Sequence, residues 1–190
     1  MNAQRSVRRS SWSPLIFFQR LNEKPLQYDL RFFFAVVVVT AVVFMLLPLF
    51  AGSYPPDEFE IGLHRLGVLV SGILIGLLQG LICGAVALLG ISLIEHFSCF
   101  SLMYIGDLKK TMKSAIYALA PFVLFFWAVV IVQIPFMDLL LLLGFGLATY
   151  FGVRIFHEMS RDRAAFLSLA TSVVFAILFH RWVFDFGSLL

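Results

Sequence analysis

Five long stretches of the chain consist almost wholly of apolar residues, and the polar residues are gathered in the connections between them. A helix needs roughly 20 apolar residues to cross the hydrocarbon core of a bilayer, a length that each stretch reaches or approaches. The pattern therefore predicts an all-α fold, a five-span transmembrane helix bundle. The predicted spans cover residues 32–51, 66–94, 114–134, 139–155 and 164–179.

The second apolar stretch is too long for one straight crossing and too short for two crossings joined by a turn. It predicts one long, tilted helix that extends past the membrane surface. A shorter apolar segment, SWSPLIFFQRLNEKP, precedes the first span, with Ser13 placed to cap a helix and Pro14 to begin it. This segment predicts an amphipathic helix in the membrane interface, and the basic QRSVRR before it would be attracted to anionic headgroups. We expect residues 1–31 to form this cytoplasmic tail and interfacial helix, and residues 32–190 a single transmembrane domain.

Composition and charge support this interpretation. Hydrophobic residues make up 61% of the 190 and charged residues 13%, whereas soluble domains contain about 45–50% and 25%. Twelve of the fourteen Lys and Arg residues lie in the N-terminal segment and in the second and fourth connections. Because basic residues mark cytoplasmic segments, this predicts an N-in/C-out protein of the cell inner (cytoplasmic) membrane. The connection after the first span, GSYPPDEFEIG, is acidic and predicted to lie outside.

The second span carries four glycines at a spacing of four residues, in GILIGLLQGLICG. Helices in lipid associate by close backbone packing, which small residues permit. Gly72, Gly76, Gly80 and Gly84 therefore predict a glycine zipper on one face of the helix. We favour packing against the third or fifth span over a seam between two copies of the chain.

Few polar side chains lie within the spans. Gln79 must find a hydrogen-bond partner in lipid, and we favour a bond between helices over the lining of a solute path. Ser168, Thr171 and Ser172 give the fifth span a small-residue face that could receive the glycines. In the third span Pro121 removes a backbone hydrogen bond and frees the carbonyl of Tyr117. We favour a fixed kink here over a hinge or a lined cavity.

Candidate chemistry is sparse. Glu95, His96 and Cys99 could bind a metal, but an interfacial cluster at a helix end is the favoured interpretation. No phosphate loop, dinucleotide fingerprint or nucleophile elbow is present. We expect no cofactor, no metal and no nucleic-acid partner. An enzyme acting on lipid is the least favoured class, and its candidates would be Glu95, His96, Asp107, His157 and Glu158.

The sequence nevertheless resembles a known family. The resemblance rests on a motif in which a tyrosine precedes a proline by four residues and follows several basic residues. The stretch that contains it reads DLKKTMKSAIYALAPFVLFFWAVVIVQIPFMDLLLLLGFGLATYFGVRIFHEMSRDRAAFLSLATSVVF. With the early SPLIFFQRL, it is similar to the Yip family of multi-pass proteins named for interacting with Ypt/Rab GTPases, and in particular to its bacterial branch. The resemblance implies a helical bundle and a non-enzymatic membrane role, which in eukaryotic relatives lies in vesicle trafficking.

Two departures limit what the resemblance implies. The long polar N-terminal region of the eukaryotic members is missing, and SCFSLMYIGDLKK stands where they carry an acidic DLYGP-like motif. Rab binding is therefore not inferred. The leading hypothesis is a scaffold or membrane-organising protein that binds the bilayer and other membrane proteins or itself. The alternative is a small-solute transporter or channel subunit with a path lined by Gln79, the Pro121 kink and the polar face of the fifth span.

Overall fold

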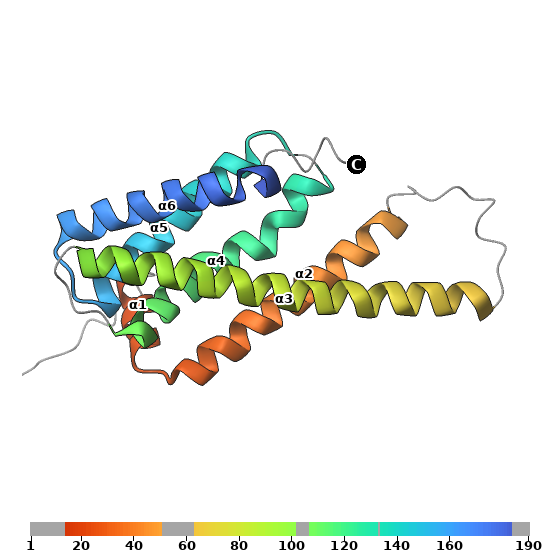
Figure 1. Ribbon diagram of the computed structural model, residues 1–190, viewed down its shortest axis with the longest axis horizontal. Coiled ribbons are helices and arrows are strands. Elements are labelled where there is room, and N and C mark those ends of the chain that lie inside the picture. The colour runs from red at the N-terminus through yellow and green to blue at the C-terminus, as the bar shows by residue number, and fades with distance from the viewer. Residues whose placement is uncertain (1–13, 51–62, 102–106, 133, 184–190) are drawn as a thin grey trace, which may run out of the picture.

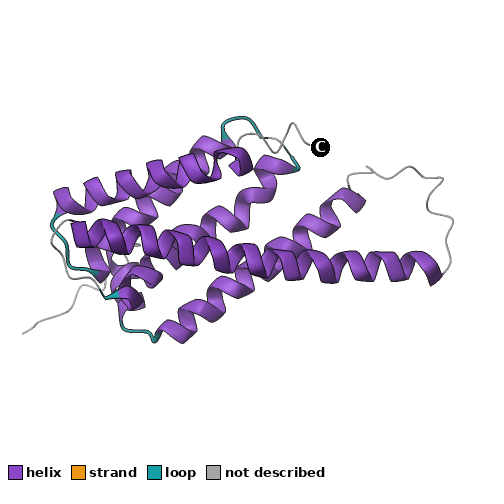
Figure 2. Cartoon of the chain, in the orientation of Figure 1, coloured by secondary structure: helices purple, strands orange, loops and turns teal. Residues whose placement is uncertain are grey.

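The computed structural model describes residues 14–50, 63–101, 107–132 and 134–183, and its regular elements there are six α-helices (Figures 1 and 2). Each predicted apolar stretch falls mainly on one of the last five helices, which confirms the all-α fold. Ser13, the basic tail and the GSYPPDEFEIG connection lie outside the described residues. The helices are α1 (Pro14–Asn22), α2 (Leu26–Phe50), α3 (Leu63–Ser101), α4 (Leu108–Val130), α5 (Met137–Phe156) and α6 (Arg161–Val183).

Four of the helices, α2 to α5, contain a segment long and apolar enough to cross a membrane. The fifth predicted span lies on α6, which is not among these candidates; its first turn carries Arg161, Asp162 and Arg163. The structure therefore supports a multi-pass membrane protein with four candidate spans in the described part of the chain.

The helix α3 is a single element of 39 residues, as the uninterrupted apolar stretch predicts. Its candidate span, Val70–Phe100, has 31 residues, which at 1.5 Å per residue is about 46 Å. Tilting alone would have to reach about 50° to fit this length into a 30 Å hydrocarbon core, beyond the usual range of about 0–40°. Part of α3 must therefore lie outside the hydrocarbon core.

The helix α4 is the centre of the bundle and contacts α2, α3 and α5 (Figure 1). Its residues from Lys113 to Ala120 are all buried. Small side chains such as Ala115, Ala118 and Ala120 let three neighbouring helices approach it at once. Pro121 follows directly, is exposed, and lies within the continuous helix.

The helix α1 closes one end of the bundle, as Figure 1 shows. Pro14 begins it, as predicted, and its Phe18 and Leu21 side chains are buried. The Phe18 ring packs against Tyr117 of α4 and Phe156 of α5, with centroids 6.0 and 5.8 Å away. One face of α1 is therefore held by protein, while Leu15, Ile16 and Phe17 remain exposed.

The glycines of α3 do not pack where the sequence predicted. A Cβ atom placed on Gly84 would lie 2.9 Å from Val37 of α2, and one on Gly80 would lie 3.3 Å from Ala41 of α2. One on Gly72 would have no neighbour within 4 Å. The expected packing against the third or fifth span was wrong for Gly80 and Gly84, because α2 crosses α3 on this face.

The small-residue face of α6 also meets a different partner. Ser168 donates a hydrogen bond to the Gly146 carbonyl of α5 at 2.8 Å, and a Cβ on Gly146 would lie 2.9 Å from the Ser172 hydroxyl oxygen. The serines of α6 thus pack against a glycine of α5. The expectation that they would pack against the α3 glycines was wrong. Thr171, on the same helix, is fully buried.

Candidate functional site

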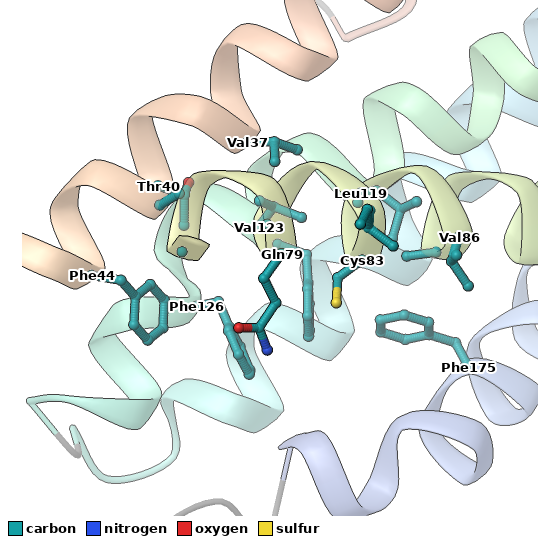
Figure 3. Close-up of a pocket in the computed structure, with 17 residues that line it drawn as sticks. Val37, Thr40, Phe44, Gln79, Cys83, Val86, Leu119, Val123, Phe126 and Phe175 are labelled. Carbon is teal, nitrogen blue, oxygen red and sulfur yellow. The ribbon is translucent and has the colours of Figure 1, made fainter. Parts of the chain in front are cut away.

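A cavity of about 560 Å³ lies between α2, α3 and α4, with Phe175 of α6 at one end (Figure 3). Three glycines contribute to its lining. Gly76, Gly80 and Gly84 lie on its wall and supply no side chain to fill the gap between the three helices. The glycine stripe therefore both brings α3 close to α2 and leaves a hollow beside the contact.

Aromatic rings form the α4 and α6 side of this cavity. The Phe175 ring is stacked on Phe145 of α5 at 4.4 Å between centroids and meets Phe122 of α4 edge-on at 4.9 Å. Phe122 in turn stacks on Phe126 at 5.7 Å. Because these rings join three helices, that wall is a packed part of the core.

The remaining lining is also apolar, apart from three residues. Thr40, Gln79 and Cys83 carry polar atoms, and no charged side chain reaches the cavity in the described part of the chain. The Thr40 side chain is 6% exposed, and its hydroxyl oxygen makes no hydrogen bond to any described residue. Gln79 is exposed, so it lies at the edge of the cavity.

The structure does not bring the predicted path residues together. Gln79 lines the cavity, but Pro121, Ser168, Thr171 and Ser172 do not. Gly76, Gly80 and Gly84 line it too, whereas Gly72 lies beyond it. Tyr117 belongs to a different site, at the α1 end of the bundle.

That second site is a buried ion pair between α2 and α4, which the sequence analysis missed. The Lys113 ammonium lies 3.6 Å from the Asp29 carboxylate, and Tyr117 donates a hydrogen bond to the same carboxylate. Lys113 also donates to the backbone carbonyls of Leu21 and Asn22, at 3.2 and 3.1 Å, and to that of Lys24. One ammonium group thus satisfies carbonyls at the end of α1 and joins α1 and α2 to α4.

The burial of Asp29 could have been predicted from the sequence. Asp29, Phe33, Val37 and Thr40 are all buried, and their spacing of three or four residues places them on one face of a helix. The apolar run begins only at residue 32, so extending its buried face one turn toward the N-terminus would have placed Asp29 inside the bundle.

More polar side chains are buried nearby, between α3, α4 and the end of α5. The Glu95 carboxyl group is fully buried beside the Ser114 hydroxyl, but neither carboxyl oxygen makes a hydrogen bond within the described ranges. His157, directly after α5, is also fully buried, and its Nε2 lies 3.3 Å from the Thr111 hydroxyl. No three His, Cys, Asp or Glu side chains of the described residues are grouped as ligands of one metal ion.

The environment of His157 makes stability depend on pH. Burial, and then the positive charge of Lys110 and the neighbouring His96, lower the pKa of His157 from 6.5 to about 4, against an opposing effect of Asp107. Between these values the unfolded chain binds a proton that the folded chain does not, so stability falls as the pH drops from about 6.5 to 4. At 1.36 kcal/mol per pKa unit the loss approaches about 3 kcal/mol.

We expect the melting temperature in mild detergent to fall over this pH range, and the His157→Gln variant to show a smaller fall. Glutamine keeps a hydrogen-bonding group for Thr111 but does not titrate. A pH profile with the same slope in both proteins would contradict the assignment.

Comparison with known proteins agrees with this architecture. The family model described as the Yip1 domain matches residues 9–181, which includes all of α1 to α5 and most of α6. No curated protein and no solved structure matches the chain. Because the family model covers far more than half of the sequence, and the described residues form apolar helices able to span a membrane, the chain belongs to the Yip1 domain family of membrane proteins.

Proposed function

We propose that this protein is a non-enzymatic, multi-pass protein of the cell inner membrane that organises its surroundings by binding other membrane proteins. The observation behind this proposal is that buried polar side chains join the helices to one another. Asp29, Lys113 and Tyr117 join helices to one another, as does Ser168. The cavity between α2, α3 and α4, in contrast, has a mainly apolar lining. The buried polar side chains named above therefore act in holding the bundle together.

The proposed topology has five spans, with the N-terminus in the cytoplasm. The α6 helix has 23 residues, about 35 Å, so it is long enough to cross if its charged first turn lies at the surface. The described basic residues of the inside segments lie on α1, in the turn between α1 and α2, at the start of α2, α4 and α6, or at the end of α5. These helix ends meet at the α1 end of the bundle (Figure 1), which supports a cytoplasmic location for that end.

Purification from membranes at native expression in a mild detergent, with mass spectrometry of the co-eluting proteins, tests the proposed role. We expect at least one membrane protein to co-elute in constant proportion through two successive columns. Extraction with a harsher detergent should break this association, because contacts between apolar helix faces depend on a bilayer-like solvent. Recovery of a lone monomer from mild detergent would contradict the proposal.

The transporter alternative keeps one residue in its favour, Gln79 at the cavity edge. Apart from Thr40 and Cys83, the rest of the lining is apolar and includes Phe122, Phe126 and Phe175. Transferring a polar group to such surroundings without a hydrogen bond is costly. Modification of a cysteine at residue 79 by a membrane-impermeant thiol reagent, after replacement of Cys83 and Cys99, would favour transport over the proposed role.

A further inference from the structure

We propose that the cavity between α2, α3 and α4 binds one acyl chain of a bilayer lipid. Its volume of about 560 Å³ lies within the range of about 300–1,000 Å³ typical of small-molecule sites, and its lining is apolar with a few polar atoms, as such sites are. All the lining residues except Phe175 belong to α2, α3 and α4, each of which contains a candidate membrane span. Hydrocarbon chains are therefore the ligand that the cavity meets at the highest concentration.

A single acyl chain suits this cavity better than a spanning helix of another protein does. An α-helix with side chains is at least about 10 Å across, whereas an acyl chain is much thinner and flexible, so it can enter the gap between α2, α3 and α4.

The polar atoms of the cavity indicate at which end the ester group of that lipid would lie. Figure 3 shows Thr40, Gln79 and Phe126 toward one end, and Cys83 and Phe175 toward the other. Phe126 lies four residues before the end of α4, which is about 6 Å along the helix axis. The polar end of the cavity is thus the end nearer the α4–α5 turn, and we place the lipid ester there.

The Thr40 hydroxyl provides a donor at this end. It is buried and makes no hydrogen bond to any described residue, and a buried hydroxyl without a partner is costly. An ester carbonyl would accept its hydrogen bond, while the acyl chain runs from there toward the aromatic wall at Phe122 and Phe175. The occupant is accordingly a lipid of the leaflet that faces the α4–α5 turn.

Native mass spectrometry of the full chain, purified in a mild detergent and supplied with a diacyl phospholipid, tests this assignment. We expect one lipid per chain to survive washing. Cys83→Phe, which places a ring in the cavity, should reduce the bound fraction at least tenfold.

Leu78→Phe is the matched control, because Leu78 is on the same helix, is 61% exposed, and does not line the cavity. This variant should retain the lipid. Ala87→Leu, a smaller change in the lining, replaces Cys83→Phe if that variant does not elute as a folded species.

Three results would overturn the assignment. Equal lipid retention by the wild type and the cavity variants would show that the lipid lies elsewhere, and equal loss in the Leu78→Phe control would show adhesion to the outer surface. A co-eluting protein that Cys83→Phe removes, with no lipid in the wild type, would assign the cavity to a protein partner. The lipid measurements do not depend on whether the co-purification in mild detergent succeeds, so the two proposals fail separately.

The position of the ester is tested with a dialkyl ether phospholipid of the same headgroup and chain length. The ether lipid lacks the carbonyl, so we expect the wild type to bind it more weakly than the diacyl lipid. Thr40→Val keeps the shape of the side chain and removes the hydroxyl, and should bind the two lipids equally. Equal binding of both lipids by the wild type would overturn the contact between Thr40 and the ester.

Discussion

Replacement of Gly152 by alanine is expected to lower the free energy of unfolding by about 1–3 kcal/mol, the range for an extra methyl group in a packed interface. A Cβ atom on Gly152 would lie 2.6 Å from the Ser114 hydroxyl oxygen and 3.1 Å from the Ser114 Cα atom. The backbone of α4 would therefore have to move away from α5, and α4 is held by α2 and α3 on its other sides. Thermal unfolding in mild detergent measures the effect.

Gly144 on the same helix provides the control. A Cβ atom there would have no neighbour within 4 Å, so Gly144→Ala adds helix propensity without a clash, and we expect a gain of up to about 1 kcal/mol. The two alanine substitutions should thus change the melting temperature in opposite directions. A loss of the same size in both variants would mean that the α4–α5 contact at Gly152 is not the cause.

The second large effect is expected for Lys113→Met. Methionine matches the length of the lysine stem but leaves the buried Asp29 carboxylate without its cation, and three carbonyls around the end of α1 without their donor. Removal of one partner of a buried ion pair costs about 3–5 kcal/mol. We expect a correspondingly lower melting temperature, and faster proteolysis of the α1–α2 turn in protein held below that temperature.

Lys109→Met is the matched control, because Lys109 is exposed on the first turn of the same helix, and it should change stability by less than about 0.5 kcal/mol. The double variant Asp29→Leu/Lys113→Met should recover part of the loss, since apolar residues can replace a buried pair. If the double variant were less stable than Lys113→Met, the unpaired Asp29 would not be the source of the effect.

Helix positions could be predicted from the sequence because they depend on local features, namely the length of the apolar runs and the residues that begin a helix. This holds for the single long α3 and for the start of α1 at Pro14. Periodicity also predicted that the glycines of α3 share a face, and Gly76, Gly80 and Gly84 all line one cavity. Periodicity does not show which helix lies opposite that face. For Gly80 and Gly84 that helix is α2.

The cavity and the buried ion pair were harder to predict from the sequence, because both depend on how the helices pack. A cavity is the volume that three helices fail to fill, so it depends on how Phe122 and Phe175 meet as much as on the glycines. Asp29 and Lys113 were overlooked because each lies just outside a predicted apolar span, where a charged residue would ordinarily face water or headgroups. In the folded chain both are buried, and the Lys113 ammonium lies against the backbone carbonyls at the end of α1.

The ion pair under α1 also sets an order of events during synthesis. Asp29 and its partner Tyr117 are 88 residues apart in the chain, and at about 5–20 residues per second α4 emerges about 4 to 18 s after the start of α2. During that interval Asp29 has no partner, and the end of α1 has no ammonium group to cap it. The first helix to be made is therefore among the last to dock, since its Phe18 also packs against Phe156 of α5, which is made later still.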